Sequence, residues 1–232
     1  MNKLKNIIPE KVYIKFLDIY NTFFTDYATK TYSQEGEDLI LRKIFDKQED
    51  GFYIDIGAHH PKRFSNTYYF YKKGWSGINI EARPGSKILF DKIRPRDINL
   101  EQAISSEPSE LKYYMYNEPA LNGFSLPNVN NLKDHPNYRI VKELNLLTER
   151  LDTILNNNIN SERSIDFMSV DVEGLDYDVI VSNNWNIYKP RIVLVEDPEY
   201  DFKLGSKISK FLESNNYQIF ARTFNTSFYR LI

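Results

Sequence analysis

Short apolar runs that end at or near an acidic residue recur along this chain, and helical patterns separate them. The clearest run covers residues 51–57 and lies between two glycines. Such runs are typical of strands that are buried on both faces of a parallel sheet. Because parallel neighbours need a crossover, the helical segments between the runs indicate right-handed βαβ units. The sequence therefore predicts an α/β fold around one open sheet.

The expected strands can be placed along the whole chain. Five of them are expected to follow one another in parallel, and the last two form a terminal antiparallel hairpin. They cover residues 51–57, 77–81, 97–100, 165–171, 191–196, 217–220 and 227–231. Between the third and fourth strands, a strand-like run at 111–116 leads into Asn- and Pro-rich sequence. Residues 111–147 are therefore an expected insertion or lid, either on the substrate side or a mere exposed connector.

The chain of 232 residues suits one buried core with a short extension. Residues 1–31 form the extension, since the apolar positions between 7 and 29 have helical spacing, and residues 32–232 form the main domain. We expect this amphipathic helix to pack on the main domain or on a second copy of the chain, giving a homo-oligomer.

Charge and cysteine content limit the partners and the compartment. With 30 basic and 32 acidic residues, the formal net charge of -2 disfavours nucleic acid as a substrate. The absence of cysteine excludes disulfides and thiolate metal sites, and it agrees with a reducing compartment. No apolar stretch has the length of a membrane span, so the expected location is the cytoplasm.

The first strand end has features of a nucleoside site. Asp55 and Gly57 lie at this end, and Glu81 lies one βα unit later, where an acidic side chain can accept both hydroxyls of a ribose. Residues 58–61, Ala-His-His-Pro, do not continue a G-x-G-x-x-G pattern and leave little room for a pyrophosphate. These residues favour S-adenosylmethionine over NAD.

A second group of carboxylates ends the fourth and fifth strands. Asp171 and Glu173 are two residues apart, and Glu196 ends the neighbouring strand. They could attract a cationic sulfonium, hold a divalent metal through Asp171, Glu173 and Glu196, or act as a general base on a hydroxyl. Alternatively, Asp171 or Glu173 caps the helix that follows.

Two of the three histidines, His59 and His60, fall in the first strand-end loop. A neutral imidazole there could take the proton of an acceptor hydroxyl or bind a metal, although loop histidines are often only polar turn residues. The third, His135, is expected on the surface.

Five segments, in order along the chain, resemble the FkbM family of methyltransferases. They are residues 32–38 (YSQEGED), 53–59 (YIDIGAH), 64–68 (FSNTY), 74–81 (GWSGINIE) and 166–174 (DFMSVDVEG). The resemblance implies a class I methyltransferase sheet, Rossmann-like, with seven strands of which the last is antiparallel. It also implies S-adenosylmethionine at Gln34, Asp55, Gly57, Ala58, Glu81, Ala82, Glu101, Gln102 and Ala103. His59 and His60 depart from the family, since many members have Asn and a further glycine there.

The expected function is S-adenosylmethionine-dependent O-methylation of a sugar or sugar nucleotide, in surface-glycan or natural-product biosynthesis. Asp171, Glu173, His60 and His59 are the candidate catalytic residues. One alternative is an NAD-dependent nucleotide-sugar oxidoreductase or epimerase, which the missing glycine pattern disfavours. The other is a non-catalytic binding module that works through the N-terminal helix.

Overall fold

The computed structural model describes residues 9–124 and 137–232. The chain divides into two compact units, Met1–Thr31 and Tyr32–Ile232. The loop around Asn128, and His135 with it, lies outside the described residues. Within the described ranges, no helix is both long and apolar enough to cross a lipid bilayer.

The first unit contains the helix α1, Glu10–Phe23, which is shorter than the predicted 7–29. Its C-terminal end is followed by side-chain turns, in which Thr25 and Asp26 accept hydrogen bonds from the amides of Tyr27 and Ala28. Such local bonds compete with helix continuation. No residue of α1 is buried, and several large apolar side chains are exposed: Val12, Ile14, Phe16, Ile19, Tyr20 and Phe23.

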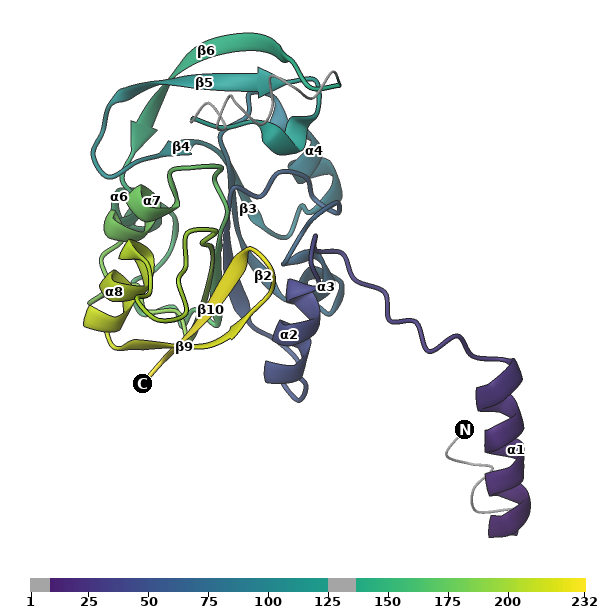
Figure 1. Ribbon diagram of the computed structural model, residues 1–232. Coiled ribbons are helices and arrows are strands. Elements are labelled where there is room, and N and C mark those ends of the chain that lie inside the picture. Colours follow the sequence, from purple (N-terminus) through teal and green to yellow (C-terminus); the bar gives the residue numbers. More distant parts are fainter. Residues whose placement is uncertain (1–8, 125–136) are drawn as a thin grey trace. The chain divides into compact units, whose positions relative to one another are not determined.

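The second unit alternates helices and strands, as predicted (Figure 1). Its elements are α2 (Glu37–Ile44), β1 (Phe52–Ile56), α3 (Tyr68–Lys72), β2 (Ser76–Glu81), α4 (Ser86–Ile93), β3 (Ile98–Glu101), β4 (Ala103–Ile104), β5 (Glu110–Tyr116), η1 (Pro119–Leu121), β6 (Ile140–Glu149), α6 (Leu151–Asn158), β7 (Phe167–Val170), α7 (Asp176–Val181), β8 (Ile192–Glu196), α8 (Lys207–Ser214), β9 (Tyr217–Arg222) and β10 (Thr226–Leu231).

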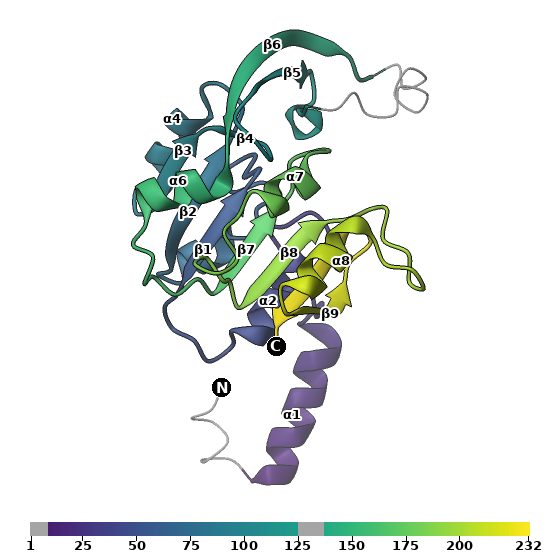
Figure 2. The same cartoon turned by 90° about the vertical axis from the view of Figure 1, so that its left-hand side faces the viewer.

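The main sheet has seven strands in the order β3-β2-β1-β7-β8-β10-β9. Its first five strands pair in parallel, and β10 runs antiparallel to both of its neighbours. The expected α/β fold, a class I methyltransferase Rossmann-like sheet with its last strand antiparallel, is confirmed. In Figure 2 the parallel strands point toward the end of the unit where β5 and β6 lie.

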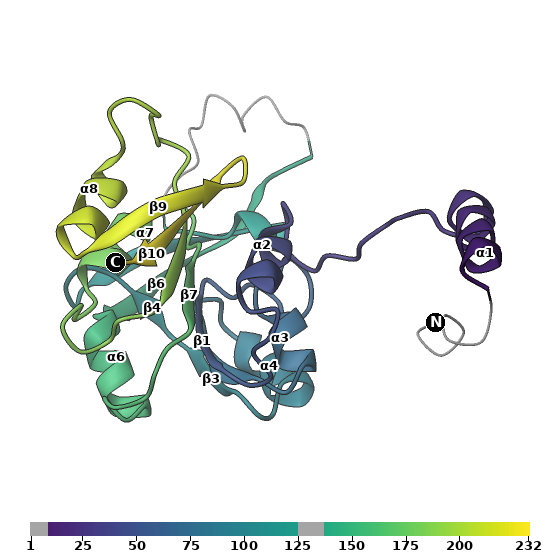
Figure 3. The same cartoon turned by 90° about the horizontal axis from the view of Figure 1, so that it is seen from below.

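Helices cover both faces of the sheet, with α2, α3 and α4 on one side and α6, α7 and α8 on the other (Figure 3). Alternate side chains of β1 pack against these two helix layers, because successive side chains of a strand point to opposite faces. Tyr53 packs with Phe70 and Trp75 on the α3 side, whereas Ile54 and Ile56 pack in the core on the other side. Each such fully buried side chain contributes roughly 1.5–3 kcal/mol.

A buried ion pair in the turn between α4 and β3 bonds to β1 and β2. Arg94 and Asp97, whose side chains have no exposed surface, bond through Nε and Oδ2 at 2.8 Å. Tyr53 donates its hydroxyl to Asp97 and accepts a bond from Arg94, and the amide of Gly77 donates to Asp97. Because all of these buried polar groups are partnered, the pair is compatible with a stable core.

The segment 111–147, predicted as an insertion or lid, contains a hairpin over the carboxyl end of the sheet (Figures 1 and 2). Strands β5 and β6 pair antiparallel, and β6 also pairs with the short β4. The strand β6 was not predicted, because most of its residues are exposed and its pairing with β5 rather than burial defines it.

Candidate active site

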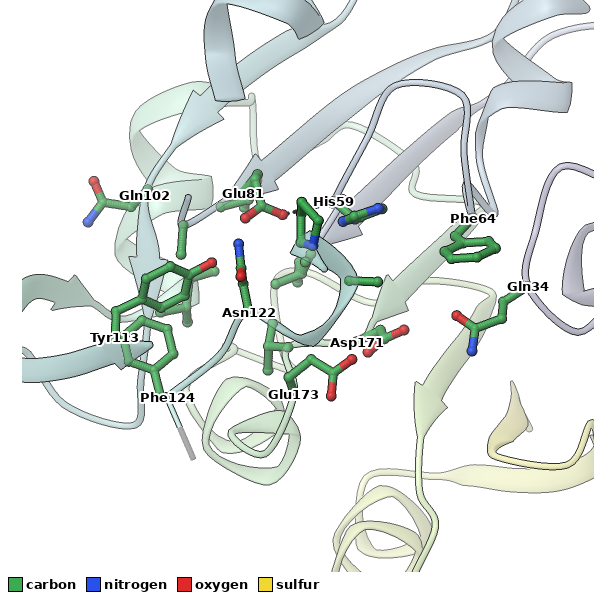
Figure 4. Close-up of a pocket in the computed structure, with 18 residues that line it drawn as sticks. Gln34, His59, Phe64, Glu81, Gln102, Tyr113, Asn122, Phe124, Asp171 and Glu173 are labelled. Atoms are coloured by element: carbon green, nitrogen blue, oxygen red, sulfur yellow. Dashed lines mark hydrogen bonds between the residues drawn. The ribbon is translucent and has the colours of Figure 1, made fainter. Parts of the chain in front are cut away.

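An open cleft lies at the carboxyl ends of β1, β2 and β7, beneath the hairpin. Its empty volume, which includes the open solvent space at its mouth, is about 710 Å³. Figure 4 shows its lining residues. Glu81, Gln102, Tyr113, Asn122 and Phe124 gather toward one end, whereas Asp171, Gln34 and Phe64 lie toward the other.

Gly57 brings the loops after β1 and β7 together. Its backbone has φ +75°, and a Cβ placed on it would lie 1.6 Å from the carbonyl oxygen of Asp171. The amide of Gly57 donates to the carbonyl of Ile80 at 2.9 Å, and the amide of Asp171 donates to Ile56 at 3.0 Å. Only glycine fits this combination of conformation and contact, so the three strand ends meet in one place.

Glu81 is the buried carboxylate at the end of β2. One of its oxygens accepts the amide of His59 at 2.7 Å, and the other accepts the amide of Arg83 at 2.8 Å. Burial raises the pKa of Glu81, and these two amides oppose the rise. An ionised carboxylate has about four acceptor positions. The two amide bonds therefore fix the side chain and leave acceptor capacity for a ligand.

Carboxylates dominate the other end of the cleft. Asp171 and Glu173 line it, and Asp171 keeps contact with solvent through the cleft although protein atoms crowd its carboxylate. Burial among protein atoms and the neighbouring charge of Glu196 raise the pKa values of both Asp171 and Glu173, that of Glu173 to about 8. Within the described ranges, no lysine or arginine forms an ion pair with Asp171 or Glu196.

Asp176 joins this group, although the sequence interpretation did not single it out. Ligand atoms of Asp171, Asp176 and Glu196 all lie within 4.8 Å of one another. Asp176 also accepts the amides of Val172 and Gly174 at 3.0 and 3.2 Å, so it closes the loop before α7. The sequence signal for Asp176 was its place in the first turn of the helix that was expected after the fourth strand.

The two histidines differ in position. His59 lines the cleft, and burial followed by the charge of Arg63 lowers its pKa to about 4, so the ring is neutral at physiological pH. The Nδ1 of His60 accepts the amides of Lys62 and Arg63 at 3.0 Å each, and His60 does not line the cleft. His60 thus stabilises the turn formed by residues 60–63.

The predicted cofactor residues fall into two groups. Those that line the cleft are Gln34, Gly57, Glu81, Ala82 and Gln102. The other four, Asp55, Ala58, Glu101 and Ala103, do not. Asp55 accepts a 2.6 Å bond from the hydroxyl of Thr67 on the α3 side of the sheet, and Glu101 accepts the amide of Gly85. Ala58 and Ala103 are buried.

Several lining residues were not predicted individually. Phe64 lies in one of the motif segments, Tyr113 comes from β5, and Asn122 and Phe124 come from the connection between β5 and β6. The only signal for the last three was the insertion or lid expected at 111–147. Gly123 lets this part of the chain approach Glu173 closely, because a Cβ on it would lie 2.7 Å from the Cβ of Glu173.

Comparison with known proteins agrees with this geometry. A family profile described as the methyltransferase FkbM domain matches residues 55–219, which run from β1 into β9 and include both ends of the cleft. No curated protein matches the chain.

Proposed function

Because this chain belongs to the FkbM methyltransferase family, we propose that it transfers the methyl group of S-adenosylmethionine to a hydroxyl of a sugar or sugar nucleotide. The observation that carries the proposal is the cleft with Glu81 at one end and the carboxylates Asp171 and Glu173 at the other. The family match favours methyl transfer over the oxidoreductase and binding-module alternatives.

The residues of the cleft fit this cofactor. Glu81 is fixed by two amides and can accept the ribose hydroxyls, while Ala82, Gln102 and Phe124 supply apolar and amide surface for the base. Gly57 leaves the space that a Cβ would fill. When bound, the cofactor supplies an electrophilic methyl group.

We assign removal of the hydroxyl proton to the carboxylate oxygens of Asp171 and Glu173. An ordinary carboxylate is a weak base for an alcohol. Burial and the charge of Glu196 raise the pKa values of this pair and make it a stronger base. Neutral His59, beside the same cleft, can accept or donate a hydrogen bond to orient the acceptor.

A divalent metal is the alternative aid to deprotonation, and the cluster of Asp171, Asp176 and Glu196 supports it. Glu173, expected as a ligand from the sequence, is not part of this cluster. The cluster residues would hold the ion, which would supply charge to polarise a hydroxyl. Dialysis against EDTA distinguishes the two routes. Unchanged turnover supports proton transfer to the carboxylates alone, whereas a loss that Mg²⁺ restores supports the metal.

Titration calorimetry with S-adenosylhomocysteine tests the cofactor assignment. We expect Glu81→Ala to weaken binding by about 10- to 100-fold, because hydrogen bonds to a charged group are lost. Glu101→Ala is the matched control, since Glu101 ends the next strand but does not line the cleft. No binding to the wild-type protein at millimolar ligand would contradict the proposal.

The acceptor, the partner and the location complete the proposal. A screen of sugar nucleotides and free sugars with labelled cofactor would identify the acceptor class. We further propose that the apolar face of α1 packs against a second copy of the chain, and that the enzyme works in the cytoplasm.

A further inference from the structure

The segment from Gly57 to Ile80 has an unusual charge for this chain. It contains no acidic residue and four basic ones, Lys62, Arg63, Lys72 and Lys73, although the chain as a whole has a formal net charge of -2. The segment includes the first strand-end loop and α3. Positive charge is therefore concentrated beside a cleft that is rich in carboxylates.

Two of these lysines lie against tyrosine rings. The Nζ atom of Lys62 is 5.8 Å from the centre of the Tyr68 ring, and that of Lys72 is 5.5 Å from the Tyr32 ring. Lys72 also donates to the Tyr32 hydroxyl at 3.0 Å. The rings of Tyr32 and Tyr68 meet edge to face, with centroids 4.9 Å apart. We call these four residues, Lys62, Tyr68, Tyr32 and Lys72, the Lys–Tyr strip.

The strip continues from the mouth of the cleft. The amide of Ser65 donates to the carbonyl of Tyr32 at 3.0 Å, and the preceding residue, Phe64, lines the cleft. Gln34, two residues after Tyr32, lines it as well. Both lysines of the strip are exposed, and neither forms an ion pair with a carboxylate of the described part of the chain.

We propose that the Lys–Tyr strip binds an anionic saccharide portion of the acceptor, whose charge comes from a carboxylate or a phosphate. The inference rests on the proposed methyl transfer to a sugar and names the class of sugar. Ammonium groups attract the anion, and half-buried tyrosine rings offer apolar faces with polar edges to a sugar ring.

The charge pattern also orients the acceptor. Among the described residues, none that lines the cleft is a lysine or an arginine, while Lys62 and Lys72 attract an anionic group to the strip outside. The neutral hydroxyl that accepts the methyl group therefore enters the cleft, and the charged part stays at the mouth. This arrangement gives one preferred direction of binding.

Calorimetry on the full chain tests the strip with three probes of equal length. These are an oligogalacturonate, a phosphorylated maltooligosaccharide and the neutral maltooligosaccharide. We expect at least one anionic probe to bind and the neutral one to bind more weakly, and the two anionic probes distinguish carboxylate from phosphate. Binding should weaken as salt increases, because exposed charges are screened.

Paired variants assign the binding to these residues. Lys62→Ala with Lys72→Ala should weaken the anionic probe about tenfold, the scale expected for two exposed charge pairs, and Lys62→Arg with Lys72→Arg should retain it. The control, Lys189→Ala with Lys210→Ala, removes the same charge from exposed positions, and Lys210 is on α8 across the sheet.

The outcomes separate this inference from the proposed function. Equal binding of neutral and anionic probes, equal loss in the control pair, or equal binding of a single-stranded DNA oligomer would overturn the saccharide assignment. S-adenosylhomocysteine affinity should stay unchanged in both lysine pairs. If that ligand does not bind the wild-type protein while the anionic saccharide does, the methyl-transfer proposal fails and the strip remains.

Discussion

At the scale of single residues, Glu173 differs from an ordinary glutamate in how firmly it holds a proton. Burial disfavours its charged form, and the charge of Glu196 adds to the effect, so its pKa is raised to about 8. His59 shifts the other way, because burial and the charge of Arg63 disfavour the imidazolium. The two candidates for the proton acceptor therefore change their protonation in different pH ranges.

The pH dependence of kcat/KM should identify the base. If the Asp171–Glu173 pair accepts the proton, the active form is the deprotonated one. Its fraction grows as pH rises, so the rate should increase up to about pH 8. With a pKa of about 4, His59 is already neutral above pH 5 and adds no further rise there.

Two variants check this interpretation of the profile. Glu173→Gln should lose about 100-fold or more in kcat, as expected when a general base is removed, and the rise toward pH 8 should disappear or shift. His59→Ala should keep that rise. An unaltered profile in Glu173→Gln would assign the proton to another group.

Some of these residues could be predicted from sequence and others could not. Glu81, Asp171 and Glu173 were identifiable because the end of a buried parallel strand fixes which edge of the sheet they occupy. Asp55 lies on the same strand as Ile56, but it points to the α3 side, where Thr67 bonds it. Which face a single carboxylate takes depends on packing partners that are distant in the sequence.

At the scale of elements, the site depends on how closely the loops after β1 and β7 approach. Gly57 is the point of contact, since any side chain there meets the backbone of Asp171. Gly74 also has a positive φ, of 105°, but has nothing within 4 Å of its position for a Cβ. A substitution at Gly74 therefore tests backbone strain alone, whereas a substitution at Gly57 adds a steric clash.

Alanine substitutions at these glycines should have different effects on stability. Gly74→Ala should cost about 1–2 kcal/mol of unfolding free energy through the positive φ alone. Gly57→Ala should cost roughly 1–3 kcal/mol more, because the loops must separate, and it should weaken S-adenosylhomocysteine binding. Urea unfolding and calorimetry measure the two effects. Equal losses in the two variants would show that the contact with Asp171 is unimportant.

The strands of the main sheet were predictable from their short apolar runs, and the hairpin was not. Strand β6 has mostly exposed residues, and its ten-residue length depends on pairing with β5. Its sequence therefore carries little of the burial signal that marks β1 or β8. Sequence indicated an insertion or lid, either on the substrate side or a mere connector, but not that it would place Tyr113 over the cleft.

At the scale of the whole molecule, the N-terminal unit tests the proposed self-association. The side chains of Phe16 and Phe23 on α1 are 52% and 76% exposed. If this face packs against a second copy, Phe16→Ser with Phe23→Ser should lower the molar mass measured by light scattering after size exclusion. Lys11→Ser with Lys15→Ser, elsewhere on the helix, should leave the mass unchanged. A wild-type chain that is monomeric at all concentrations would contradict the proposal.

The two ends of the cleft have different walls, and this difference bears on how two ligands could share it. The hairpin side chain of Tyr113, with Asn122 and Phe124, borders the end near Glu81, and Gly123 seats this wall against Glu173. If the cofactor occupies the end near Glu81, as proposed, it faces the hairpin, and the end beside Phe64 is left to the acceptor.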